Sequence, residues 1–147
     1  MDDLRELYRE LILDHNQNPH NFGELVDATA KADGFNPLCG DRLTLYLKMT
    51  DELVEDVKFV GSGCAISKAS ASIMTTVLKG KTRTEVIALF QTFQRMATTG
   101  EIPDSDLGKL AVLSGIHKYP ARVKCAMLAW HTAKNALVGS KAIAKTE

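Results

Sequence analysis

Two stretches of alternating apolar and polar residues, joined by a short turn, constrain the fold of this chain most strongly. Every second side chain is apolar in residues 42–49, and residues 54–60 alternate again, with Val57 and Phe59 on one face. Successive side chains of a strand point to opposite faces, so this spacing is typical of half-buried strands. Two such strands joined by a short turn form an antiparallel hairpin, whose apolar face other elements must cover.

The flanking segments change to a helical spacing of apolar residues. Four of them carry an apolar stripe with three- and four-residue steps: residues 4–13, 64–78, 84–98 and 120–138. Gly80 ends the second of these helices, and Pro120 suits the first turn of the last. We also expect a short helical piece near residues 107–113 and an irregular first strand within residues 26–35. These elements predict an α+β fold, in which a small antiparallel sheet of about three strands packs against helices.

The composition fits one globular domain and excludes several classes of protein. Of the 147 residues, 45% are hydrophobic and 24% are charged, as in globular proteins and unlike disordered chains. There is no internal repeat and no linker, so we expect residues 1–147 to form a single domain. Lys plus Arg number 18, as do Asp plus Glu, which argues against nucleic acid as a partner. No apolar run approaches the ~18 residues of a membrane span, so no membrane association is expected.

The zero net charge hides two oppositely charged halves. Residues 1–64 carry 13 acidic and 6 basic residues, giving −7, and residues 65–147 carry 5 acidic and 12 basic residues, giving +7. Either the halves pack together and neutralise each other, or the second half forms a basic patch that meets an acidic partner.

The three cysteines, Cys39, Cys64 and Cys125, are expected to be reduced thiols in the cytoplasm. The acidic N-terminus lacks the basic and apolar regions of a secretory signal peptide. The odd number and wide spacing of the cysteines fit no disulfide framework, and the absence of a C-x-x-C pair excludes a zinc-finger or thioredoxin-like motif. All three lie at the ends of predicted elements, which favours a chemical role over simple packing.

Asp41 and the three cysteines form a candidate ligand set for a metal. Asp41 follows Cys39 by two residues, and Cys64 and Cys125 lie near predicted helix starts, where the helix dipole stabilises a thiolate. Soft thiolates select zinc or iron–sulfur chemistry over magnesium or calcium. The competing interpretation is that the cysteines are small core residues and that Asp41 caps a turn.

Of the four histidines, His131 is interpreted as structural, and the roles of His15, His20 and His117 stay open. His15 and His20 lie in an Asn-rich segment that we expect to be a hydrogen-bonded loop. His131 lies on the last predicted helix, off the face of Cys125, and His117 is not close to any cysteine in the sequence. No local signature supports a Cys–His protease, and serine-hydrolase, P-loop and zinc-protease motifs are absent.

Three cysteine motifs resemble those of the U-type iron–sulfur assembly proteins, the IscU/NifU-N superfamily. The motifs are Pro37-Leu38-Cys39-Gly40-Asp41, Gly61-Ser62-Gly63-Cys64-Ala65-Ile66-Ser67 and Pro120-Ala121-Arg122-Val123-Lys124-Cys125. Residues 14–21 and the hairpin match as well, so the resemblance covers essentially the whole chain. It implies a SufE/NifU-like fold and a role in iron–sulfur cluster biogenesis.

Within that superfamily, two features are most similar to the SufU branch. Sixty residues, 65 to 124, separate Cys64 from Cys125 and include an insertion relative to IscU at residues 100–119. Lys124 stands where IscU scaffolds carry a histidine just before their last cysteine. The resemblance therefore implies a zinc-dependent sulfurtransferase.

In that branch the zinc ligands correspond to Cys39, Asp41, Cys64 and Cys125, and Cys39 corresponds to the sulfur acceptor. The implied donor is a pyridoxal-phosphate cysteine desulfurase of the SufS type, and other SUF assembly proteins are possible further partners. Two alternatives stay open. The chain could be an IscU-type scaffold that assembles and transfers a [2Fe–2S] cluster on the same cysteines, or a zinc-stabilised interaction domain without a desulfurase partner.

Overall fold

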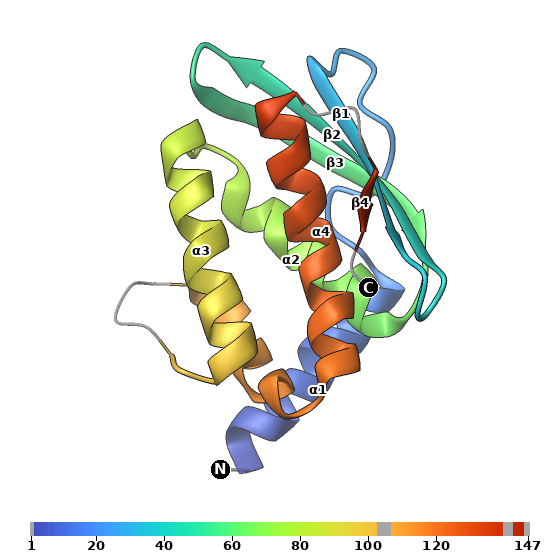
Figure 1. Cartoon of the computed structure of the whole chain (residues 1–147), viewed down its shortest axis with the longest axis vertical. Coiled ribbons are helices and arrows are strands. Elements are labelled where there is room, and N and C mark those ends of the chain that lie inside the picture. The colour runs from blue at the N-terminus through green and yellow to red at the C-terminus, as the bar shows by residue number, and fades with distance from the viewer. Residues whose placement is uncertain (1, 103–106, 140–142, 146–147) are drawn as a thin grey trace.

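The computed structural model describes residues 2–102, 107–139 and 143–145 of the chain (Figure 1). Its elements in chain order are α1 (Asp2–Gln17), β1 (Ala30–Asn36), β2 (Asp41–Thr50), β3 (Leu53–Ser62), α2 (Ala65–Leu78), α3 (Arg83–Thr99), the 3-10 helix η1 (Gly108–Lys118), α4 (Pro120–Val138) and β4 (Ala144–Lys145). The predicted α+β fold is confirmed. The single domain over residues 1–147 stays a prediction.

The sheet has the strand order β3-β2-β1-β4. The neighbours β1 and β2, and likewise β2 and β3, pair antiparallel, as the alternating stretches predicted. The two-residue strand β4 adds a parallel edge next to β1, where Gly34 pairs with Ala144. Sequence analysis did not predict β4, because two residues are too short to show an alternation. The first strand begins at Ala30, later than the predicted residue 26.

Helices α2 and α4 cover one face of the sheet, and α3 lies on their side that faces away from it (Figure 1). Leu45 and Leu47 of β2 are completely buried at this interface. Between the helices, the rings of Phe93 on α3 and Trp130 on α4 stack with centroids 4.9 Å apart. The apolar stripes of strand and helix thus form one continuous core, which fixes the ends of the elements relative to one another.

Two helical segments extend beyond their predicted bounds. α1 continues to Gln17, so His15 lies on a helix and not in the predicted loop. The piece expected near residues 107–113 is a 3-10 helix that reaches Lys118. The predicted ends rested on local sequence alone and are too early. Contacts with neighbouring elements extend both helices beyond them. Within the described residues, every helix is too short or too polar to cross a membrane.

Candidate metal centre

Cys39, Asp41, Cys64 and Cys125 come from three separate parts of the fold that meet at one end of the sheet. Cys39 lies in the turn between β1 and β2, and Asp41 is the first residue of β2. Cys64 caps the N-terminus of α2, and Cys125 lies in the second turn of α4. The β1–β2 connection and the helices α2 and α4 therefore carry all the candidate ligands that the sequence suggested.

The distances show how closely these four side chains gather. The Sγ atoms of Cys39 and Cys125 are 3.5 Å apart, and an oxygen of Asp41 lies within 4.8 Å of both. Cys64 joins the group through Asp41: its backbone N–H donates to Oδ1 at 2.8 Å, and its Sγ lies 3.9 Å from Oδ2. The structure thus groups the ligand atoms of Cys39, Asp41 and Cys125, and Cys64 lies beside Asp41. The role of the four residues as metal ligands stays a prediction.

The four side chains differ sharply in exposure. Asp41 is completely buried, Cys125 is 4% exposed, Cys64 is half-buried and Cys39 is exposed. Gly40, next to Cys39, has φ +75°, and no atom lies within 4 Å of the position that a Cβ would occupy there. Cys39 is therefore the one thiol of the group that lies on an open turn, where another molecule can approach it.

The thiols of half-buried Cys64 and buried Cys125 shift each other's pKa in opposite directions. A hydrogen bond with Cys125 lowers the pKa of Cys64 to about 6, and the backbone N–H of Ser67 adds to this effect. The same hydrogen bond, together with burial, raises the pKa of Cys125. The expectation of a stabilised thiolate at both helix starts is therefore right for Cys64 and wrong for Cys125. Cys125 lies in the second turn of α4, where the dipole of the helix end is weaker.

The surroundings of Asp41 allow a test of whether a cation fits this group. The buried carboxylate accepts hydrogen bonds from the Asn36 side chain at 3.2 Å and from the Cys64 backbone. Among the residues that the structure describes, no lysine, arginine or histidine forms an ion pair with it. A buried carboxylate is normally paired with a cation or coordinates a metal. Three sulfur donors and one carboxylate oxygen match the tetrahedral ligand preference of zinc, so the residues fit this ion.

The comparison with protein families adds an independent observation. The family model described as "NifU-like N terminal domain" matches residues 7–126, a range that contains all four candidate ligands. The chain belongs to this NifU-like family. The family resemblance drawn from the three cysteine motifs is thereby confirmed.

Three relatives show how far this similarity to NifU-like proteins extends. The chain is 47% identical over 128 residues to the zinc-dependent sulfurtransferase SufU of Bacillus subtilis, covering 86% of each protein. It is 43% identical over 134 residues to the iron–sulfur cluster assembly scaffold protein IscU of Thermotoga maritima, covering 91% of this chain and 94% of the relative. The crystal structure of FiSufU from Fervidobacterium islandicum, a candidate scaffold protein for the SUF system, matches with a TM-score of 0.84 and 35% identity, covering 90% of this chain and 97% of that one.

Gly63 gives a direct test of the packing around Asp41 in this NifU-like chain. Its φ is +152°, and a Cβ at this position would lie 2.3 Å from Oδ1 of Asp41. We expect Gly63→Ala to displace the carboxylate, to destabilise the protein by about 2 kcal/mol and to reduce the zinc content after dialysis. Gly23→Ala is a matched control, because Gly23 has φ +142° with no atom within 4 Å of its Cβ position. Equal zinc content and urea stability in the two variants would contradict this account of the site.

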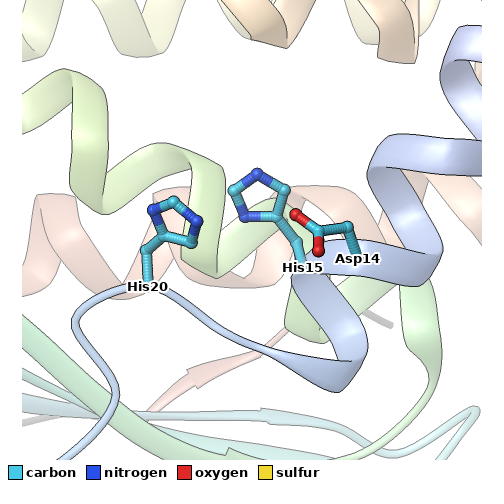
Figure 2. Close-up of side chains that lie close together, drawn as sticks. All are labelled: Asp14, His15 and His20. Carbon is cyan, nitrogen blue, oxygen red and sulfur yellow. The ribbon is translucent and has the colours of Figure 1, made fainter.

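A second group of ionisable side chains lies at the end of α1. Figure 2 shows Asp14, His15 and His20 side by side. The two imidazole rings stack with centroids 4.5 Å apart and an angle of 27° between their planes. The lone pair of an imidazole nitrogen lies in the plane of its ring. In two stacked rings these lone pairs do not converge on one point, so the pair is poorly arranged to bind a single metal ion. Instead, Ser72 of α2 forms hydrogen bonds with both histidines. Its Oγ lies 2.7 Å from Nδ1 of His15 and accepts the His20 backbone N–H at 2.7 Å.

His117 and His131 each contact residues outside the candidate metal centre. Nδ1 of His117 lies 2.9 Å from the carbonyl oxygen of Ser114 within η1. The ring of His131 packs edge-on against Phe90, and burial lowers its pKa. These contacts agree with the structural interpretation of His131.

One contact of the centre was missed by sequence analysis. Asn36 is completely buried, and its Nδ2 lies 3.2 Å from Oδ2 of Asp41 and 3.6 Å from Sγ of Cys125. The Asn-Pro pair at positions 36 and 37 marks a turn, which is the only local signal for this residue. Its contact with Cys125, 89 residues away, depends on the fold.

Proposed function

We propose that this protein is a zinc-dependent sulfur acceptor that works with a cysteine desulfurase in iron–sulfur cluster biogenesis. The observation that carries the proposal is the exposed thiol of Cys39 lying 3.5 Å from the sulfur of buried Cys125, beside an otherwise unneutralised buried carboxylate. The similarity to the Bacillus subtilis zinc-dependent sulfurtransferase supports it. The expected location, the cytoplasm, keeps the thiols reduced.

Four residues have defined parts in this proposal. Cys39, Asp41, Cys64 and Cys125 hold the zinc ion, which supplies positive charge that keeps the bound thiols ionised. Three of these ligands are held by regular elements: Asp41 by the start of β2, Cys64 by the start of α2 and Cys125 by the second turn of α4. Cys39 lies on the exposed turn and is the residue that reacts.

The reaction is the transfer of one sulfur atom between two cysteines. The Cys39 thiolate attacks the outer sulfur of a persulfide on the desulfurase. A sulfur–sulfur bond forms at Cys39 while the bond to the desulfurase cysteine breaks, and that cysteine leaves as a thiolate. The outer sulfur keeps its proton, so Cys39 becomes a persulfide without any oxidant or reductant. We propose a pyridoxal-phosphate enzyme of the SufS type as donor and other SUF assembly proteins as the next acceptors.

Three basic residues, Arg42, Lys68 and Lys124, lie within four positions of a candidate ligand in the sequence. Arg42 and Lys68 line a small cavity together with Ser67, whose backbone N–H binds Cys64. Lys124 directly precedes Cys125 in the sequence. None of these three cations forms an ion pair with another described residue. Lys68 and Lys124 belong to the second half of the chain, whose +7 charge would suit an acidic partner.

A desulfurase assay tests the proposal. Turnover of cysteine by a SufS-type enzyme is measured alone, with the zinc-loaded protein and with the zinc-stripped protein. We expect strong stimulation by the zinc-loaded form only. Equal turnover in all three reactions would overturn the proposal. The scaffold alternative, favoured by the similarity to IscU, predicts instead that anaerobic reconstitution with iron and sulfide yields a stable [2Fe–2S] chromophore in preference to zinc.

A further inference from the structure

Asn36, the last residue of β1, contacts three parts of the candidate metal centre through one side chain. Its two amide hydrogens face two different acceptors, Oδ2 of Asp41 at 3.2 Å and Sγ of Cys125 at 3.6 Å. Its Oδ1 accepts the backbone N–H of Leu38 at 3.2 Å. The side chain is completely buried. Every polar group of the amide is therefore used within the centre.

The backbone of Asn36 also anchors the turn that carries Cys39. Its carbonyl oxygen accepts the N–H of Gly40 at 2.8 Å, and Asn36 is paired with Asp41 in the register of β1 and β2. Cys39 thus lies between two residues, Leu38 and Gly40, that both bond to Asn36. The base of the turn is fixed by these bonds, whereas the Cys39 side chain at its tip is exposed.

We propose that Asn36 is a positioning residue that holds Asp41 and Cys125 in place independently of Cys39. Its amide donates to both groups and fixes their orientation, as outer contacts of metal ligands commonly do. When Cys39 leaves the group to take up sulfur, Asp41 and Cys125 keep their hydrogen bonds to Asn36. The inference rests on the proposed function for the step that Cys39 performs, but the positioning of the other ligands can be measured without a desulfurase.

The chemistry of the site explains why an amide is suited to position 36. An aspartate there would place a second carboxylate beside Asp41 and remove both donors, in a buried position where like charges strongly oppose ionisation. An apolar side chain would leave the two acceptors without their partner. Only a neutral side chain with two donors satisfies Asp41 and Cys125 together.

The test measures zinc affinity by competition with a chelator, in the wild type and in Cys39→Ser, each with and without Asn36→Asp. We expect Asn36→Asp to weaken zinc binding about 10- to 100-fold. We expect about the same fold loss in the Cys39→Ser background, because the Asn36 contacts with Asp41 and Cys125 do not involve Cys39. Asn36→Ser, which is uncharged and has one donor on a shorter side chain in place of two, serves as a second variant if the aspartate prevents folding. Asn18→Asp, on an exposed site, controls for the added charge.

Two further measurements separate positioning from a purely structural role. The absorption spectrum of the Co²⁺-substituted protein reports tetrahedral thiolate coordination, and we expect Asn36→Ser to change it. Asn36→Ser should lower the urea midpoint of the zinc-stripped protein less than that of the zinc-loaded protein. Unchanged zinc affinity in both backgrounds, or an equal loss of stability with and without zinc, would overturn the inference. If zinc binding depends on Asn36 while the desulfurase is not stimulated, the proposed function fails and the positioning role stands.

Discussion

Replacing Cys39 with serine is expected to reduce sulfur acceptance from a cysteine desulfurase to the background level. The hydroxyl of serine is not ionised near neutral pH and cannot replace a thiolate as the attacking group. The fold should persist, because Cys39 is exposed and the buried Asp41 and Cys125 keep their contacts with Asn36. The measurement is the stimulation of desulfurase turnover by the zinc-loaded variant.

The neighbouring Leu38 provides a matched control for the Cys39 result. Leu38 lies in the same turn and is 60% exposed, so Leu38→Ser alters the turn but keeps the thiol. We expect Leu38→Ser to retain sulfur acceptance at saturating protein concentration. Full acceptance by Cys39→Ser would show that another residue takes the sulfur.

Replacing Asp41 with alanine is expected to cost both the zinc ion and much of the stability. Asp41 is completely buried and accepts hydrogen bonds from the Asn36 side chain and the Cys64 backbone. Leaving these two donors unpaired should lower the free energy of unfolding by about 3 kcal/mol even without zinc. Loss of the ion adds to this, since structural zinc sites bind with roughly 10–16 kcal/mol, as much as a whole domain's stability.

Urea denaturation with and without zinc measures both effects, and elemental analysis measures the zinc content. Asp33→Ala is the matched control, because Asp33 is an exposed carboxylate on β1 that binds Thr44. That variant should stay within about 0.5 kcal/mol of the wild type. An Asp41→Ala protein with the zinc content and stability of Asp33→Ala would contradict the assignment of Asp41.

The sequence was informative wherever a residue pattern repeats along one element. Alternation identified the hairpin of β2 and β3, and the helical stripe together with Pro120 predicted α4 with the bounds that the structure has. β4 and the length of η1 were missed, because neither has a repeat that distinguishes it from a loop. His15 was placed in a loop because Asn-rich sequence usually ends a helix, whereas packing against Ser72 extends α1 past it.

The candidate site was predicted from residue types, but its inner contacts were not. Thiol chemistry and three motifs were enough to select Cys39, Asp41, Cys64 and Cys125. The contact with Cys64 that raises the pKa of Cys125 and the hydrogen bonds of Asn36 depend on residues far apart in the sequence. Local spacing carries no information on such contacts. They can be identified only from the packing of β1 and β2 against α2 and α4.

Peptide mass mapping after reaction with a desulfurase tests the central claim most directly. The zinc-loaded protein is incubated with a SufS-type cysteine desulfurase and cysteine, its thiols are trapped with an alkylating reagent, and the three cysteine peptides are compared. The account predicts the mass of one additional sulfur atom on the peptide that contains Cys39 and none on the peptides of Cys64 and Cys125. Additional sulfur on Cys64 or Cys125 in place of Cys39, or none on any peptide while the desulfurase is active, would contradict it.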